Sequence, residues 1–302
     1  MEALQRRLES QLSAPVEPAV REFAQALAEE AGALAVLFYG SNLRTRSLEG
    51  VLDFYVLIPG DASEEPRIWP TVSYHERTHG GQTLRAKVAT MRAQTFAKAA
   101  SGHLRDTTIW ARFVQPCALV WQRDEASAQS VLVAVASAAM TAAQLAVALG
   151  PPNGTADNYW RALFQATYKA EFRVEKPGRE NDILSVNAAH FDGLLPAALE
   201  AAGIAFTVQG ERITPALSPR ERENLLKWWK TRQRLGKPLN FTRLLKASTT
   251  FEGAAKYAAW KIERHTGMPV EVTPFRERCP VLAAPSVLFS LWRHKRKRSA
   301  AD

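Results

Sequence analysis

Cysteine is scarce in this chain, because only Cys117 and Cys279 among its 302 residues carry a thiol. The two lie far apart and have no metal-type spacing. The sequence therefore predicts neither a disulfide framework nor a zinc cluster, and we interpret both as reduced thiols in a cytosolic-type compartment. Hydrophobic residues make up 46% of the chain and charged residues 23%. These proportions are those of a soluble globular protein and exclude a disordered or collagen-like chain.

Long uncharged apolar runs are also few. The first residues, MEALQRRLESQLS, mix acids with arginines and have no apolar centre, so they predict neither a secretory signal nor a typical transit peptide. The longest run, 131–149, approaches the length of a membrane span. It is rich in alanine and contains Ser137, Thr141 and Gln144, which favours a closely packed core helix. We therefore expect any membrane contact to be peripheral.

Acidic residues are outnumbered by basic ones. Lysine and arginine total 39 against 30 aspartates and glutamates, which gives a net charge of +9. This excess favours an anionic partner, such as a nucleotide, a nucleic acid or an acidic lipid surface. The sequence contains no zinc-finger pattern and no aromatic RNA-binding motif, which argues against a nucleic-acid partner.

Hydrophobic runs and helix breakers predict an α/β half, 1–150, and a mostly helical half, 151–302, separated at Gly-Pro-Pro-Asn-Gly. Short apolar runs predict strands at 34–39, 51–58, 71–74, 83–90 and 117–122. Helical spacing predicts helices at 3–31 (interrupted near two prolines), 92–101, 126–150, 157–172, 183–203, 218–235 and 250–266. A short hairpin is expected at 206–213.

One constellation points to chemistry: a strand, then Gly40-Ser41, then about a dozen residues and a second strand that carries Asp53. Gly40 lets the backbone approach a triphosphate without a β-carbon, and Ser41 offers a hydroxyl and an N–H at the start of the next helix. Asp53 can then place a carboxylate beside the same phosphates to hold Mg²⁺. The alternative is a tight strand–helix turn followed by an ordinary strand aspartate.

This pattern resembles the signature of the nucleotidyltransferase (polymerase-β-like) fold, whose usual form ends in Asp-x-Asp, whereas position 55 here is tyrosine. Within that superfamily the chain resembles the mitochondrial-type CDP-diacylglycerol synthases, also called translocator assembly and maintenance proteins. In that family a single aspartate is followed by an apolar run and a further aspartate, here Asp61. The resemblance implies an α/β nucleotidyltransferase domain over 1–150, followed by a mostly helical domain over 151–302.

Four later segments carry the same resemblance. They are GGQTLRAKVAT (80–90), TTIWARFVQPCALV (107–120), LAVALGP (145–151) and ATYKAEFRVE (166–175). The second segment places Arg112 in a family-like motif. The last places Glu171, where the family has aspartate, and Arg173.

The resemblance implies transfer of a cytidylyl group from CTP to phosphatidic acid, which makes CDP-diacylglycerol and pyrophosphate with Mg²⁺ as cofactor. The expected catalytic residues are Asp53, Glu171 and Arg173, and the expected metal ligands are Asp53 and Glu171. A site for a nucleotide and phosphatidate must offset several negative charges, so clustered lysines and arginines are expected around it. The expected nucleotide-binding residues are Gly40, Ser41, Arg85, Lys87, Arg112 and Lys169.

A diacyl substrate requires a means of reaching the lipid surface. Residues 288–292 are apolar and aromatic, and residues 293–298 are strongly basic, a combination typical of a peripheral anchor on an anionic membrane. We therefore expect a cytoplasmic protein, peripheral to the inner face of the cell membrane. A disordered solubilising tail is the alternative.

Two other functions stay open. A nucleotidyltransferase could use another acceptor, such as a nucleic acid or a small phosphate. The sequence HERTH, from His75 to His79, also matches the H-E-x-x-H pattern of zinc hydrolases. Zinc hydrolases carry that pattern on a helix, whereas the residues before His75 are strand-like and Gly80-Gly81 follows at once.

Overall fold

The computed structural model describes residues 1–170, 179–250, 255, 259–260, 262–263 and 270–275. Its main sheet has five strands in the order β3-β4-β2-β1-β5. They are β1 (Ala35–Tyr39), β2 (Leu52–Ile58), β3 (Thr71–His79), β4 (Gln82–Arg92) and β5 (Cys117–Gln122). Neighbouring strands are antiparallel except β2 and β4, which run parallel. Three short strands form a second sheet: β6 (Gly154–Thr155), β7 (Phe206–Gln209) and β8 (Arg212–Pro215).

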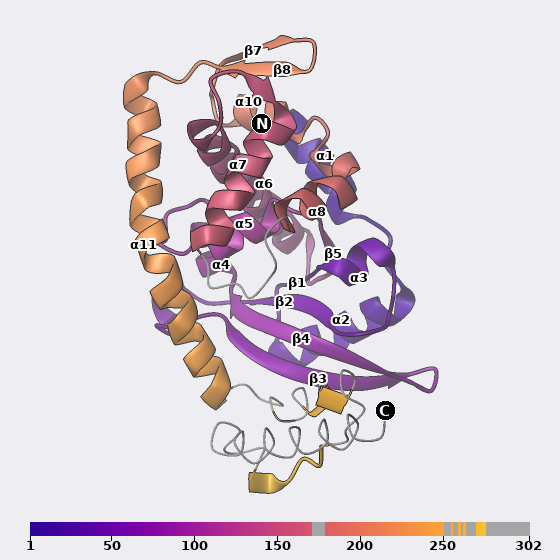
Figure 1. The fold of residues 1–302 in the computed structure, drawn as a ribbon. Helices are drawn as coiled ribbons and strands as arrows, with labels where there is room; N and C mark the ends of the chain where they lie inside the picture. Colours follow the sequence, from indigo (N-terminus) through magenta and orange to yellow (C-terminus); the bar gives the residue numbers. More distant parts are fainter. Residues whose placement is uncertain (171–178, 251–254, 256–258, 261, 264–269, 276–302) are drawn as a thin grey trace, which may run out of the picture.

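Helices cover both faces of the main sheet (Figure 1). The N-terminal half contributes α1 (Glu2–Leu12), α2 (Pro18–Ala31), α3 (Ser41–Thr45), α4 (Ala93–Ala100), α5 (Thr108–Phe113) and α6 (Glu125–Leu149). The C-terminal half contributes α7 (Ala156–Ala170), α8 (Arg179–Val186), α9 (Ala188–Phe191), α10 (Leu194–Ala201) and α11 (Pro219–Thr250). A single 3₁₀ turn, η1 (Ala62–Glu64), follows β2.

Alternation along β2 assigns its side chains to two separate cores. Phe54 faces α2, where it stacks on Phe23 with ring centroids 5.7 Å apart. Tyr55 and Leu57 face the larger helical layer and belong to its core. Because strand side chains alternate, Asp53 shares the face of Tyr55 and points toward that helical layer.

Helix α6 lies at the centre of the larger core. It packs against α1, α4, α5, α7, α10 and α11, so helices from both halves of the chain cover it. Among the described residues it is the helix whose length and hydropathy would also suit a membrane span. Its alanines allow close approach on several sides, and most of its residues are buried inside the protein.

Two arginines attach the long helix α11 to this body. Arg222 donates to the carbonyl oxygens of Ala148 and Gly150 at the end of α6, both at 3.0 Å. About three helical turns further along α11, buried Arg232 donates to the carbonyls of Gly102 and Leu104 at 2.7 and 2.9 Å. These bonds satisfy carbonyls that helix ends and loops leave unpaired.

The start of the chain is tied to a late helical segment. Arg7 of α1 donates to the backbone carbonyls of His190, at 3.0 Å, and Asp192, at the C-terminal end of α9. The Nε2–H of His190 donates in turn to the carbonyl of Val114, at 2.7 Å, so α9 is joined to the end of α5. Burial lowers the pKa of His190 to about 4, which keeps this ring neutral.

The predicted mixed α/β architecture is confirmed in general terms, and the five expected strands are present. Strands β3 and β4 are longer than expected, and α5 was not expected. The helix predicted at 183–203 is wrong: it is three short helices, broken at Asn187 and at Gly193, which has φ +68°. The helix predicted at 218–235 continues through Pro238 to Thr250. Most of the predicted 250–266 helix lies outside the described residues.

Candidate functional site

The turn after β1 brings Gly40 against the carboxylate of Asp53. Tyr39, the last residue of β1, is the cross-strand partner of Asp53, so Gly40 lies at the edge of that pair. Its φ is +91°, a conformation that favours glycine. A β-carbon on Gly40 would stand 3.0 Å from Oδ2 of Asp53. The turn therefore needs glycine both for its backbone and for the space beside the acid.

The segment between β1 and β2 is held by a buried amide. Asn42 donates through Nδ2 to the carbonyls of Ser47 and Glu49, both at 2.8 Å. The hydroxyl of exposed Ser41 approaches Oδ1 of the same amide at 3.3 Å. Helix α3 has five residues only, so its dipole adds much less to anion binding at Ser41 than the sequence led us to expect. Asn42 is a positioning residue that the sequence analysis missed.

Two cations converge on Asp53. Lys87 is its register neighbour on the parallel strand β4, and the two side chains share one face of the sheet. Arg112, on α5, lies over the same face, against the rings of Tyr39 and Tyr55. Burial raises the pKa of the half-buried Asp53 carboxyl, and the positive charges of Lys87 and Arg112 both act to lower it. The structure thus brings Gly40, Asp53, Lys87 and Arg112 together.

Two tyrosines hold the guanidinium of Arg112. Its Nη1 donates to the hydroxyl of Tyr39 at 3.0 Å, and its Cζ lies 5.1 Å from the Tyr39 ring centroid and 5.9 Å from that of Tyr55. Burial raises the pKa of Tyr39, so its hydroxyl stays protonated. Tyr39 was not among the residues predicted from the sequence. The available signal was an aromatic hydroxyl directly before Gly40.

Tyr55 occupies the strand position at which the nucleotidyltransferase signature has its second aspartate. Only 2% of this residue is exposed. Its ring meets Phe113 edge-on with centroids 5.1 Å apart and lies 5.5 Å from that of Tyr39. The position is therefore part of an aromatic core, in which Tyr55 supports the site from beneath.

Arg85 shares a face of β4 with Lys87, two residues away, but its guanidinium contacts residues outside the group around Asp53. Its Nε lies 3.3 Å from Oε1 of Glu76 on β3, and its guanidinium lies 5.3 Å from the Trp260 ring centroid. Glu76 also accepts a hydrogen bond from the hydroxyl of Tyr74, at 2.8 Å. Arg85 is thus engaged at the outer strands of the sheet.

The remaining predicted residues belong to the end of α7 or follow it. Lys169 is exposed in the last turn of α7. Glu171 and Arg173 lie outside the described residues. Ala170, just before them, is contacted by α11: a β-carbon on Gly236 would stand 2.4 Å from the carbonyl oxygen of Ala170. Gly236 therefore lets α11 cross the end of α7 backbone to backbone.

The HERTH sequence forms part of strand β3. Four residues of a strand span about 13 Å, and a zinc–nitrogen bond is about 2 Å, so His75 and His79 do not reach one ion. Glu76 points to the opposite face, where it meets Arg85. His79 faces α2 instead, with Nδ1 2.9 Å from a carboxylate oxygen of Glu22. This geometry does not fit a zinc hydrolase.

The described residues supply one carboxylate to this site. In the part of the chain that the structure describes, no group of three or more His, Cys, Asp or Glu could hold a metal ion. Asp61 lies beyond the far end of β2, where it caps η1 through the N–H of Ser63. Mg²⁺ is commonly held by one or two carboxylates together with substrate phosphates, so Asp53 alone fits a metal that arrives with its nucleotide.

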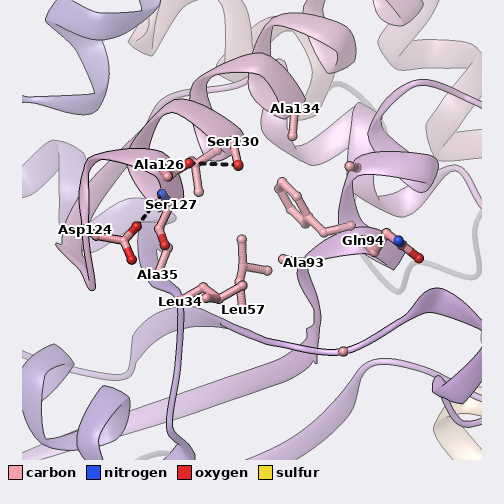
Figure 2. Close-up of a pocket in the computed structure, with 14 residues that line it drawn as sticks. Leu34, Ala35, Leu57, Ala93, Gln94, Asp124, Ala126, Ser127, Ser130 and Ala134 are labelled. Carbon is pink, nitrogen blue, oxygen red and sulfur yellow. Dashed lines mark hydrogen bonds between the residues drawn. The ribbon is translucent and has the colours of Figure 1, made fainter.

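A separate cavity of about 500 Å³ lies at the opposite end of β1 and β2 (Figure 2). Small residues of α4 and α6, including Ala93 and Ala134, leave it open, and Leu57 contributes to its floor. Asp53 and Leu57 are about 13 Å apart along β2, so the cavity is not part of the Asp53 site.

A scan against protein-family models finds no match to this chain, and a search of curated proteins finds none. One matching solved structure is that of a nucleotidyltransferase-like protein from Exiguobacterium sibiricum. It is 9% identical to this chain, with a TM-score of 0.25 over 93% of this chain and 92% of that one. Because this TM-score is low, we infer neither fold nor function from it.

Proposed function

We propose that this chain transfers a nucleotidyl group to an acceptor phosphate at the Asp53 site. One observation carries the proposal: the glycine turn after β1 lies directly against a carboxylate that has Lys87 and Arg112 beside it. A polyphosphate can approach the bare backbone at Gly40, and the two cations offset its charge. In-line displacement at phosphorus depends mainly on such positioning and charge stabilisation.

The more specific proposal is a CTP:phosphatidate cytidylyltransferase. It rests on the resemblance of the sequence segments, and on the basic charge that suits two anionic substrates. A phosphate oxygen of phosphatidate attacks the α-phosphorus of CTP, the bond to the β-phosphate breaks, and pyrophosphate leaves. Because the attacking phosphate is already anionic near neutral pH, the site needs no strong general base.

Roles follow for the chain's own residues. Lys87 and Arg112 bind and orient the phosphates, and Tyr39 keeps Arg112 in place. Asp53 would hold Mg²⁺, with Glu171 proposed as a second ligand and Arg173 as a further phosphate contact. When bound, the metal would neutralise charge that develops on the leaving pyrophosphate.

Transfer is tested with purified protein, Mg²⁺, each labelled nucleoside triphosphate in turn, and vesicles that contain phosphatidate. We expect labelled lipid from CTP. Asp53→Asn should abolish it while the fold survives, because the change keeps size and removes charge. Glu223→Gln is the matched control, since that exposed acid of α11 pairs with Lys227. Equal activity of wild type and Asp53→Asn would remove Asp53 from the site, and label in another acceptor would redirect the substrate.

We also propose that the protein is cytoplasmic and binds the inner face of the cell membrane through residues 288–298, which lie outside the described residues. Flotation with phosphatidate-containing and neutral vesicles compares the full chain with one that ends at Ala284. Salt-sensitive binding by the full chain alone supports the proposal. Equal binding by both chains would exclude the tail as the anchor.

A further inference from the structure

We propose that the Asp53 site binds the polyphosphate part of its ligand through Lys87 and Arg112 directly, so that binding does not require a divalent cation. This inference rests on the proposed function, because it concerns the same site, and it specifies which step needs the metal. The metal would be needed for transfer, whereas the protein's own cations would supply affinity.

The first argument is the composition of the site. Within the described part of the chain, the acid that faces the Gly40 turn is Asp53, and Lys87 and Arg112 both act on its charge. Among the described residues, one carboxylate against two cations gives a net positive charge, and the proposed Glu171 and Arg173 carry opposite charges that leave this balance unchanged. Such a site attracts a phosphate group before any metal is present.

Tyr55 stands where a second acid would change the charge of the site. A carboxylate at this position would add a second negative charge beside Asp53 and make a metal ion necessary to bring in a polyphosphate. Here the position is filled by a ring that packs against Phe113 and lies under Arg112. The fold has thus placed a guanidinium above an aromatic ring where a second metal ligand would otherwise stand.

The third argument is the orientation of Arg112. A guanidinium is planar, stays charged and binds phosphate oxygens in pairs, provided that its plane is fixed. Tyr39 fixes it through one hydrogen bond of 3.0 Å and through its ring, and Tyr55 adds a second ring. Lys87 contributes by its position, because its backbone pairs with that of Asp53 in the sheet and its side chain starts beside the acid.

The test is calorimetric titration of the full chain with inorganic pyrophosphate, once in EDTA and once in Mg²⁺. We expect binding in EDTA. Lys87→Met and Arg112→Met should each weaken it at least about tenfold, as loss of a charge-assisted contact does. Lys227→Met removes the same charge from an exposed helix position paired with Glu223, and should change affinity less than about twofold.

Two further variants keep the test informative if a methionine variant unfolds. Arg112→Lys keeps the charge but loses the planar fork, and Tyr39→Phe keeps the ring but loses the hydroxyl that accepts from Arg112. Both should weaken pyrophosphate binding in EDTA, with circular dichroism confirming the fold. Affinity unchanged in all four variants would overturn the assignment, as would binding seen only in Mg²⁺ or in neither condition.

The outcomes separate this inference from the proposed function. Pyrophosphate binding in EDTA by a protein that transfers no nucleotide would support the anion site and refute the transferase. Labelled lipid made by a protein that binds pyrophosphate only with Mg²⁺ would support the transferase and refute metal-independent binding.

Discussion

Asp53 and Lys87 are neighbours across the parallel strands β2 and β4, so a carboxylate and an ammonium group share one face of the sheet. Each charge changes the properties of the other side chain. Burial would hold the pKa of Asp53 higher without the ammonium charge, and the carboxylate offsets part of the charge that Lys87 presents to a ligand. This pair gives the first prediction.

Lys87→Met should shift the acidic side of the pH–rate profile for transfer to higher pH. The pKa of Asp53 is already raised by burial, and removing Lys87 takes away the largest effect that lowers it. If the ionised carboxylate is needed, activity is present above that pKa and is lost as the pH falls through it. The pH profile of kcat/KM measures the shift. A limb that stays in place, or moves to lower pH, would contradict the coupling.

Gly40→Ala should damage the site more than the fold. Alanine at a positive φ costs about 1–2 kcal/mol, and its β-carbon would also press on Oδ2 of Asp53. We expect transfer to fall by about 100-fold or more, because a small displacement of a reacting group is costly. Gly32→Ala is the matched control: its φ is +58°, yet nothing lies within 4 Å of its β-carbon. Equal activity loss in both variants would refute a local effect at Asp53.

Tyr55→Asp, which restores the usual two-aspartate spacing, should destabilise the protein by about 3 kcal/mol or more. The change removes a buried ring from between Phe113 and Tyr39 and places a charge in an apolar core. Tyr55→Phe keeps the ring and should cost less than about 1.5 kcal/mol. Chemical denaturation measures both. A fully stable Tyr55→Asp protein would show that the position tolerates an acid.

Stability should decrease as the pH falls from about 6.5 to 4, because of His190. The unfolded chain takes up a proton at the ordinary histidine pKa of 6.5, whereas burial lowers the pKa of His190 in the folded protein to about 4. The loss is at most on the order of 3 kcal/mol. His190→Gln still offers an N–H to the Val114 carbonyl and should flatten this dependence. His103→Gln, at an exposed position, should not; equal slopes in both variants would contradict the prediction.

The local parts of the fold and site were predictable from the sequence. Strand β5 and the pair Gly40–Asp53 follow from apolar runs, a glycine and one acid at short range. The helix ends near Asn187 and Gly193 were missed, because 183–203 looks continuously helical by its apolar spacing alone. Its interruption is accompanied by contacts from distant residues, such as the bonds from Arg7 to the carbonyls at the end of α9.

The partner of Arg85 could have been predicted from the sequence. A two-residue turn at Gly80-Gly81 fixes the register of the β3–β4 hairpin, and that register pairs Glu76 with Arg85. The hairpin register alone would thus have predicted that Arg85 pairs with Glu76. The contact between Tyr39 and Arg112 could not be predicted in this way, because it depends on where α5 packs over the sheet.

The link from Arg7 to the end of α9 joins residues more than 180 positions apart. During synthesis on the ribosome, α1 and α6 therefore emerge well before the helices that cover them, α10 and α11. Until those helices follow, the alanine-rich surface of α6 stays open to water and to other nascent chains. The two halves of the sequence thus complete their folding together. A chain released after residue 150 would expose part of the core helix α6 to chaperones.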